Sequence, residues 1–354
     1  MTDATTTADL NGTTAEGPLL AFDNLTVTFT SDGATVYAIR GVTFSIAREE
    51  VVGLVGESGS GKSVTSLAAM GLLAKNATVG GSVKVLGREV VGLKEKDLSK
   101  IRGTDVAMIF QDPLTALNPV YTVGWQIIEA LQAHRDFNDE QAKAEAIRLL
   151  TLAGIPRPED RLSSYPHEFS GGMRQRVVIA IAMANQPQII LADEPTTALD
   201  VTVQAQVMRT LQLALEETKS SLLLITHDLG VIAGIADRVL VMYAGRIVES
   251  GTAEDIFYQP AMPYTHGLLG SIPSVDSDDG GKLAQVPGNP PVLTDAVVGC
   301  PFAPRCPMRQ AVCLESEPSL QPVSDTHSSA CHFASEVITL PIGQMFAVDD
   351  EVTP

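Results

Sequence analysis

The sequence has several absences that narrow the class of protein. No run of apolar residues reaches the length of about 18 that is needed to cross a bilayer, so the chain is not expected to span a membrane itself. The first 17 residues, MTDATTTADLNGTTAEG, have no basic start and no apolar core, so they are not expected to be a secretory signal. These absences predict a cytoplasmic protein whose thiols stay reduced.

Basic residues are scarce relative to acidic ones. Lys and Arg number 24 against 42 Asp and Glu, which gives a formal charge of −18. This balance argues against an extended nucleic-acid surface and against electrostatic adhesion to anionic lipid. Attachment to a membrane is therefore expected to come from docking on another protein. With 354 residues, the chain is long enough for two domains.

Cysteine is absent up to residue 299, and all four cysteines then fall in one stretch, at Cys300, Cys306, Cys313 and Cys331. Disulfides are disfavoured in a reducing compartment. Four thiolates in a segment with little apolar content indicate a bound metal that supplies folding free energy. Zinc favours closer spacings, whereas this wide spacing and the Cys-Pro steps favour an iron–sulfur cluster. On the residues alone, both metals stay open.

A phosphate-binding loop is the clearest motif present. The stretch VVGLVGESGSGKS, residues 51–63, is an apolar strand followed by the pattern G-x-x-x-x-G-K-S. Lys62 is predicted to reach the β- and γ-phosphates of a nucleotide, and Ser63 to bind Mg²⁺. The residues predicted to contact ATP in this loop are Gly56, Glu57, Ser58, Gly59, Ser60, Gly61, Lys62 and Ser63.

A second motif places two carboxylates at the end of an apolar strand, in PQIILADEP at 187–195. Asp193 is predicted to bind Mg²⁺ through water, and Glu194 to polarise the attacking water as general base. Taken alone, such a pair is more often a solvated turn. The phosphate loop in the same chain is what favours the catalytic interpretation.

A third motif opens a helix with a capping serine and two glycines, in FSGGMRQRVVIAIAMANQP at 169–187. A helix N-terminus of this kind is an anion-binding site in its own right. A single ATP does not need two phosphate-binding devices in one subunit. Ser170, Gly171 and Gly172 are therefore predicted to contact the nucleotide of a second subunit, in a two-subunit sandwich.

With these motifs, the chain resembles the ATP-binding-cassette (ABC) ATPases over most of its length. The resemblance implies an α/β fold: an ABC-type P-loop core with an antiparallel β subdomain and a helical subdomain, to which a small Cys-rich metal domain would be added at the C-terminus. It also implies a stacking aromatic for adenine, which is expected to be Phe29, in LTVTFTSDG, with Tyr37 as the alternative.

The same resemblance implies roles for three further residues. Gln111, in MIFQDP, is expected to bind Mg²⁺ and to link the γ-phosphate to a transmembrane partner. Asp200, in ALD at 198–200, is similar to the D-loop aspartate of the family. His227, in LLLITHD, is similar to the switch histidine.

The chain also resembles the ATPases of oligopeptide, dipeptide and nickel importers, in the stretches QDPLTALNPVYTVGWQI, DEPTTALDVTVQAQV and FYQPAMPYTHGLLGSIP. The reading Ser-Gly-Gly-Met is similar to that of the D-type subunit of these importers. This implies a heterodimer with a second ABC ATPase, two permease subunits, an extracytoplasmic binding protein, and a peripheral place on the cytoplasmic face of the membrane, without nucleic acid. The alternatives are nickel or another small substrate, or a soluble ABC ATPase acting on nucleic acid. The resemblance also favours [4Fe–4S] over Zn²⁺ at the cysteines.

The predicted organisation has four parts. A disordered tail covers 1–18, an ATPase domain covers 19–272 with its helical subdomain at about 112–186, a four-cysteine domain covers 273–336, and an acidic tail covers 337–354. Strand patterns dominate up to residue 111, and strand and helix alternate from 187 to a predicted hairpin, RVLVMYAGRIVES. This alternation predicts a parallel α/β core.

Overall fold

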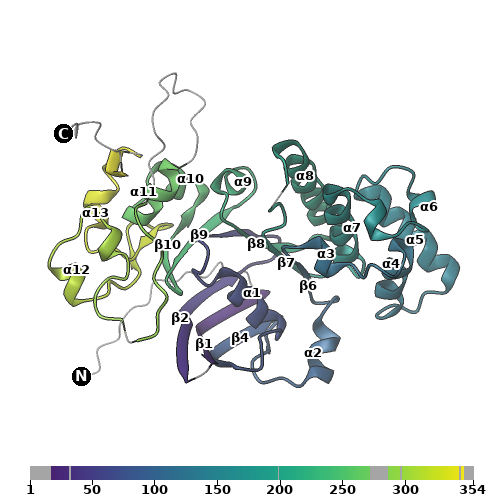
Figure 1. Cartoon of the computed structure of the whole chain (residues 1–354), viewed down its shortest axis with the longest axis horizontal. Helices are drawn as coiled ribbons and strands as arrows, with labels where there is room; N and C mark the ends of the chain where they lie inside the picture. The colour runs from purple at the N-terminus through teal and green to yellow at the C-terminus, as the bar shows by residue number, and fades with distance from the viewer. Residues whose placement is uncertain are drawn as a thin grey trace.

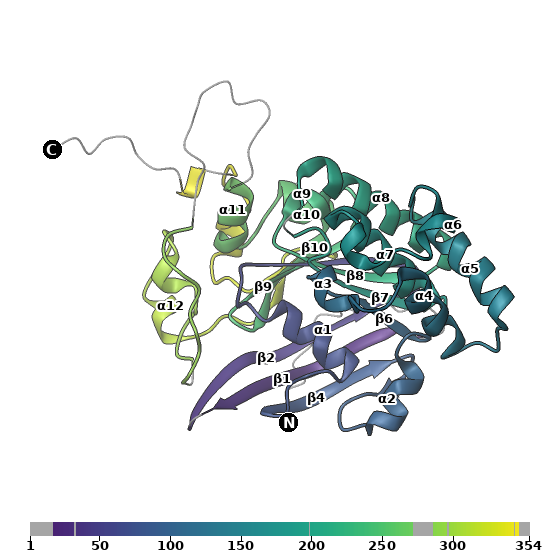
Figure 2. The same cartoon turned by 45° about the vertical axis from the view of Figure 1, so that its right-hand side comes forward.

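The computed structural model describes residues 17–31, 33–197, 199–271, 286–295, 297–342 and 344–346 (Figure 1). Parts of the predicted tails and of the predicted four-cysteine domain lie outside the described residues, as does Ala198 of the predicted D-loop. Within the described residues, two sheets lie between a group of helices on one side and the C-terminal segment on the other (Figures 1 and 2).

The smaller sheet is antiparallel and is built by the N-terminal part of the chain. Its strand order is β2-β1-β4-β5, with β1 (Leu20–Ser31), β2 (Ala34–Ile46), β4 (Ala77–Val85) and β5 (Arg88–Glu89). Side chains of β1 such as Phe22 and Val27 are buried, and Phe22 stacks on Phe44 of β2 with ring centroids 4.5 Å apart. Burial of one face is typical of an antiparallel sheet. The predicted antiparallel subdomain is confirmed.

The larger sheet has a parallel centre. Its strand order is β11-β12-β10-β9-β3-β8-β7-β6, with β3 (Val51–Val55), β6 (Val106–Ile109), β7 (Ile189–Asp193), β8 (Ser221–Thr226), β9 (Arg238–Tyr243), β10 (Arg246–Thr252), β11 (Gln321–Pro322) and β12 (Ser328–Ser329). The strands from β9 to β6 run parallel, and β9 and β10 form the predicted hairpin. The parallel core predicted from the sequence is confirmed.

Both faces of the parallel strands are covered, which explains their continuous apolar sequences. In β8, Leu222 and Leu224 join one hydrophobic core, and Leu223 and Ile225 join the other. Parallel strands buried on two faces have sequences that are unbroken apolar runs rather than alternating ones.

Among the described residues, five helices of the ATPase region lie outside the stretch 113–183. They are α1 (Lys62–Met70), α2 (Glu95–Ile101), α8 (Val201–Thr218), α9 (Leu229–Ala233) and α10 (Ala253–Tyr258).

Helices between residues 113 and 183 form the group on the right of Figure 1. They are α3 (Pro113–Ala116), α4 (Val123–Gln132), α5 (Asp139–Leu152), α6 (Pro158–Arg161), the 3₁₀ turn η1 (Pro166–Glu168) and α7 (Gly171–Met183). The side chains of Thr122, Asn138 and Ser170 accept backbone N–H bonds in the first turns of α4, α5 and α7. In the part of the chain described, no helix is both long and apolar enough to cross a bilayer.

The C-terminal segment consists of the described residues from 263 to 346. It packs on the end of the larger sheet that lies away from the helices of residues 113–183 (Figures 1 and 2). It contains α11 (Pro263–Gly270), η2 (Ala303–Arg305), α12 (Val312–Glu315), α13 (Ala334–Val337) and η3 (Gln344–Phe346). Its strand β12 pairs with β10, and Phe302 makes edge contacts with Tyr243 of β9 and Tyr264 of α11. The segment therefore extends the sheet and the hydrophobic core of the ATPase region.

Candidate functional site

The carboxyl ends of four parallel strands carry the residues predicted to handle ATP. The phosphate loop follows β3, Gln111 follows β6, Glu194 follows β7, and His227 follows β8. These strands are neighbours in the order β3-β8-β7-β6, so their carboxyl ends meet at one edge of the sheet. Ligands of open α/β sheets bind at this edge. The topology therefore brings together motifs that are far apart in the sequence.

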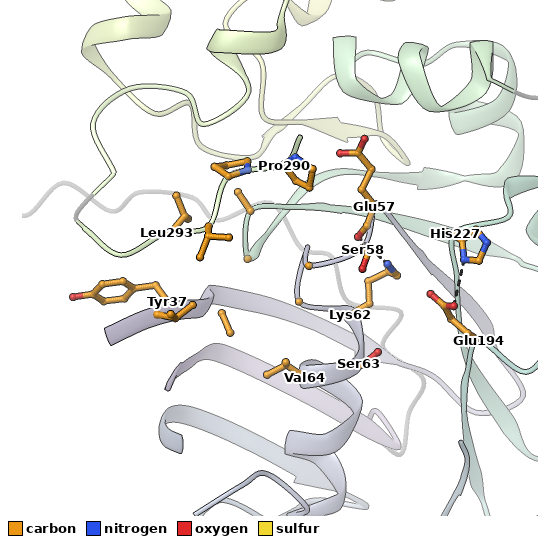
Figure 3. A pocket seen from close by; sticks show the side chains of 18 of the residues that line it. Tyr37, Glu57, Ser58, Lys62, Ser63, Val64, Glu194, His227, Pro290 and Leu293 are labelled. Atoms are coloured by element: carbon orange, nitrogen blue, oxygen red, sulfur yellow. Dashed lines mark hydrogen bonds and ion pairs between the residues drawn. The ribbon is translucent and has the colours of Figure 1, made fainter. Parts of the chain in front are cut away.

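A cleft of about 830 Å³ opens at this edge (Figure 3). Its floor includes most of the phosphate loop together with Gln111, Glu194 and His227. Its apolar wall comes from β2, through Val36 and Tyr37, and from the segment at 290–293. A volume of this size lies within the range of about 300–1,000 Å³ that is usual for small-molecule sites.

Two glycines allow the phosphate loop to follow its path. Gly56 has φ 152°, and a Cβ there would lie 2.2 Å from the carbonyl oxygen of Met242. Gly61 has φ 109°, and a Cβ there would lie 2.8 Å from the carbonyl oxygen of Ala38. A side chain at either position would displace backbone as well as strain its own. The loop then enters α1, whose N-terminal N–H groups are suited to phosphate.

Lys62 is held inside the loop. Its ammonium donates to the carbonyl oxygens of Gly56 at 2.8 Å and Glu57 at 3.0 Å, and the residue is only 5% exposed. Burial lowers the pKa of Lys62, and the nearby carboxylates of Glu194, Asp193 and Glu57 oppose that effect. The side chain therefore presents a buried cation beside three carboxylates.

Ser63 and Asp193 form a pair of oxygen ligands suited to Mg²⁺. The Ser63 hydroxyl donates to Oδ1 of Asp193 at 2.9 Å, which joins the start of α1 to the end of β7. Burial raises the pKa of Asp193 and the charge of Glu194 adds to this, whereas the bond from Ser63 and the charge of Lys62 lower it. Hydroxyl and carboxylate oxygens are the ligand types that Mg²⁺ prefers. The residues present therefore fit the predicted ion.

Glu194 collects three polar contacts on one oxygen. Its Oε2 accepts from Gln111 Nε2 at 3.0 Å and from Thr197 Oγ1 at 2.8 Å, and His227 Nδ1 lies 3.3 Å away (Figure 3). Burial raises the pKa of this carboxyl, but the bonds from Thr197 and His227 and the charge of Lys62 outweigh burial and hold it below its ordinary value. Glu194 is therefore an ionised carboxylate, fixed in position and facing the cleft.

Tyr37, and not Phe29, lines the cleft. The Tyr37 backbone N–H donates to the carbonyl oxygen of Leu293 at 2.9 Å, and the side chain is 39% exposed. Phe29 pairs with Val36 and with Ala77 within the antiparallel sheet, and its side chain packs on the core beneath that sheet. Phe29 is therefore not among the residues that line the cleft, and its contact with ATP stays a prediction.

The helix-opening motif lies outside this cleft. Ser170 caps α7, and its Oγ accepts from the Met173 N–H at 3.4 Å. Ser170 and Gly171 are exposed and Gly172 is buried, and none of the three lines the cleft. Asp200 caps α8 through a bond from the Val203 N–H at 3.0 Å and is likewise not in the lining.

All four cysteines are free thiols that line one small cavity, together with residues such as Met308 and Phe333. Burial raises the pKa of the Cys300 thiol. It raises the pKa of Cys306 to about 11 and that of Cys331 to about 12. Among the described residues, no group of three or more His, Cys, Asp or Glu side chains is arranged to hold a metal ion. The described residues therefore do not support the predicted Cys-rich metal domain.

Two features of the site were not predicted from the sequence: Thr197, which bonds to Glu194, and the wall of the cleft at 290–293. Thr197 was detectable, because DEPTT places a hydroxyl three residues after the predicted base. The sequence of the wall, NPPVL at 289–293, is rich in proline and contains no functional motif, so it is typical of a linker. Its contact with Tyr37 joins residues that are remote in the sequence, and no local pattern reports such a contact.

Two family profiles match the chain. One, described as ABC transporter, matches residues 39–197. The other, described as Oligopeptide/dipeptide transporter, C-terminal region, matches residues 248–313. The first match includes the phosphate loop and both carboxylates, and the second includes Cys300, Cys306 and Cys313.

The chain is also similar to curated proteins and to solved structures. It is 50% identical to the dipeptide transport ATP-binding protein DppD of Bacillus subtilis, over 88% of this chain and 94% of that protein. It is 49% identical to the oligopeptide transport ATP-binding protein OppD of Mycobacterium tuberculosis, over 95% of this chain, and spans 55% of that protein's length. A dimeric ATP-binding cassette solved in a post-hydrolysis state with ADP and Pi matches with a TM-score of 0.59 at 28% identity, covering 66% of this chain and 98% of that one.

Proposed function

Because this chain belongs to the ABC transporter ATPases and carries the C-terminal region of the oligopeptide/dipeptide transporters, we propose that it is the ATP-hydrolysing subunit of a peptide importer. One observation carries the proposal: Lys62, the Ser63–Asp193 pair and the Glu194 carboxylate converge at one cleft. They supply a cation for phosphate, oxygen ligands for Mg²⁺ and a base for water, which are the parts that phosphoryl transfer to water requires.

In the proposed reaction, water attacks the γ-phosphate of ATP and Glu194 accepts a proton from that water. The bond between the γ-phosphorus and the β–γ bridging oxygen breaks, and ADP and phosphate leave. Gln111 and Thr197 hold the carboxylate in place, and the 3.3 Å contact with Glu194 makes His227 a positioning residue. Lys62 and the loop N–H groups stabilise the charge on the phosphate oxygens. Bound Mg²⁺ supplies neutralisation of that charge, and Ser63, Asp193 and Gln111 are the residues that would hold it.

We assign the adenine contact to Tyr37. Tyr37 lies on the cleft wall beside the segment at 290–293. This position supports a binding mode in which adenine stacks between these apolar groups while the phosphates of ATP reach the loop. Aromatic rings offer favourable faces for such stacking. Phe29 is partly buried against the hydrophobic core and does not line the cleft.

The proposal includes a second ATPase subunit. Ser170 and Gly171 are exposed and lie outside the cleft, at the start of α7. A helix N-terminus with a free surface can bind phosphate from another molecule. These features support a sandwich in which Ser170, Gly171 and Gly172 contact the ATP of the partner subunit, with Asp200 near the interface.

The proposal also includes membrane subunits, which would hold the chain on the cytoplasmic face of the membrane. Large apolar side chains are exposed shortly after Gln111: Leu114 at 58%, Val120 at 71% and Trp125 at 45%. Tyr121 stacks on Trp125 with ring centroids 4.0 Å apart. Exposed apolar groups gathered in one segment indicate a protein interface. A permease docked there would lie next to the residue that contacts Glu194.

We further propose that the four thiols hold a [4Fe–4S] cluster, with Zn²⁺ as the alternative. The four cysteines line a common cavity, although no described group of side chains is arranged for a single ion. Cluster thiolates bind different iron atoms and stand further apart than the ligands of one zinc ion. A cluster bound by these thiols would stabilise the fold of the segment.

Uptake by reconstituted vesicles tests the proposed function. Vesicles holding this chain, the second ATPase and two permease subunits, supplied with the binding protein, should take up labelled peptides only with ATP. A Glu194→Gln chain should abolish that uptake. Uptake of nickel and not of peptides would contradict the peptide assignment. ATP hydrolysis stimulated by DNA, without uptake of any solute, would contradict the transporter itself.

A further inference from the structure

Every polar group of Glu57, the second residue of the phosphate loop, has a partner. Its N–H donates to the Tyr264 hydroxyl at 2.7 Å, and its carbonyl oxygen accepts from Lys62 at 3.0 Å. Its carboxylate forms a two-pronged ion pair with Arg305, at 2.6 and 2.8 Å. Two of these partners, Tyr264 and Arg305, lie in the C-terminal segment. That segment therefore fixes the first turn of the phosphate loop through its bonds to Glu57.

Arg305 is buried, at 7% exposure, and its guanidinium has several further partners. Nε donates to the carbonyl oxygen of Pro287 at 2.7 Å, and Nη2 to that of Gly288 at 3.2 Å. The cation also lies 5.9 Å from the ring centroids of Tyr243 and Phe302. The ion pair with Glu57 raises the pKa of Arg305 above its ordinary value. A buried guanidinium with this many partners fixes the segments that it joins.

One of those segments continues into the wall of the cleft. From Pro287 and Gly288 the chain runs to Pro290 and Leu293, which line the cleft opposite the phosphate loop (Figure 3). Leu293 then accepts the backbone bond from Tyr37 at 2.9 Å. Arg305 thus contacts the loop expected to hold the phosphates and the residues that directly precede the segment expected to flank the base.

We propose that Arg305 is a positioning residue for the ATP site, an inference that rests on the proposed function. By fixing Glu57 and the segment at 287–293, it holds the cleft in its binding shape before ATP arrives. A site ordered in advance loses less conformational freedom when the ligand binds. The affinity for ATP therefore depends on a residue 248 positions away from the loop that it holds.

ATP binding by the full-length chain tests this role. Arg305→Met keeps the length and apolar contacts of the side chain but removes every donor, so the Kd for Mg-ATP should rise about tenfold, the scale of a lost hydrogen bond to a charged group. The double variant Arg305→Met/Glu57→Gln, which leaves no unpaired carboxylate, should be equally weak. The matched control is Arg309→Met, which removes the same charge from an exposed side chain in the same segment.

All Kd values are measured well below the melting temperature of every variant, so that a loss of stability alone does not move them. Wild-type affinity in Arg305→Met, or recovery of wild-type affinity in the double variant, would overturn the proposal, because recovery would mean that Arg305 only neutralises Glu57. If Arg305→Met fails to fold, the double variant carries the test, since replacing both partners leaves no buried unpaired charge. If the wild-type chain binds no ATP, it is the proposed function that fails.

Discussion

At the scale of single residues, the chemistry depends on how Glu194 is held. Its backbone lies in the left-handed region, at φ 46°, and its N–H donates to Ile225 of the neighbouring strand at 2.8 Å. A non-glycine residue rarely adopts this conformation unless its surroundings require it. Here the turn directs the carboxylate into the cleft, within reach of Gln111, Thr197 and His227.

Glu194→Gln should keep ATP binding while slowing turnover by at least about 10²-fold, the scale of a lost general base. The amide retains the shape of the side chain but cannot accept the proton from water. Steady-state hydrolysis and nucleotide binding in the assembled complex measure both effects. Glu216→Gln, a neutralised carboxylate on an exposed part of α8, is the control and should behave as wild type. Wild-type turnover in Glu194→Gln would remove the assignment of the base.

Thr197→Val should shift the pH dependence of hydrolysis. The bond from Thr197 helps to hold the pKa of Glu194 below its ordinary value against burial, so its loss should raise that pKa. The carboxylate would then be protonated at a higher pH, and the acid limb of the kcat/KM profile should move toward neutral pH. A profile that stays in place, with hydrolysis otherwise intact, would show that Thr197 does not tune the base.

At the scale of elements, the C-terminal segment is joined to the ATPase core at several points. Strand β12 adds to the main sheet through Glu249 and Ser250 of β10. His327, next to that strand, lies 2.8 Å from the buried Glu249 carboxylate. The segment carries the four thiols around their cavity. Its short helices and few apolar residues offer little core of their own, so a bound metal would contribute directly to its stability.

If the four thiols hold a [4Fe–4S] cluster, protein purified without oxygen should be brown and contain about four iron atoms per chain. Cys331→Ser should lose the iron and lower the melting temperature, because cluster binding and folding of the segment are coupled. Met308→Leu, which alters the same cavity without removing a thiol, should keep the iron. A colourless protein with one zinc ion and no iron would exclude the cluster.

The elements also show what the sequence can and cannot predict. The motifs at the ends of β3 and β7 could be predicted because strand and turn signals are local there. Gln111 and His227, after β6 and β8, were predicted only through the resemblance to the ABC ATPases, and the parallel strand order brings all four together. Which of Phe29 and Tyr37 lines the cleft could not be predicted, because it depends on how the two strands β1 and β2 pack on the core. The contacts of Arg305 with Glu57 and of Leu293 with Tyr37 join distant parts of the chain, and no local pattern reports them.

At the scale of the whole molecule, one chain holds the cleft that we propose binds ATP and, outside it, the helix-opening motif that we propose contacts the ATP of a partner. The first holds Lys62, the Ser63–Asp193 pair and Glu194, and the second presents Ser170 and Gly171 to solvent. In the proposed heterodimer, a second ATPase facing this chain would complete both sites. The net charge of −18 and the exposed apolar residues after Gln111 favour a protein partner over nucleic acid.

ATP hydrolysis by the chain alone, compared with the same chain assembled with the second ATPase and the permease subunits, tests the central claim most directly. The purified monomer should bind ATP but hydrolyse it poorly, because Ser170 to Gly172 of a partner are missing from its site. Assembly should raise turnover by at least about 10²-fold, the scale on which one preorganised donor to a developing charge acts. The same turnover in a demonstrably monomeric preparation as in the complex would contradict the shared-site account.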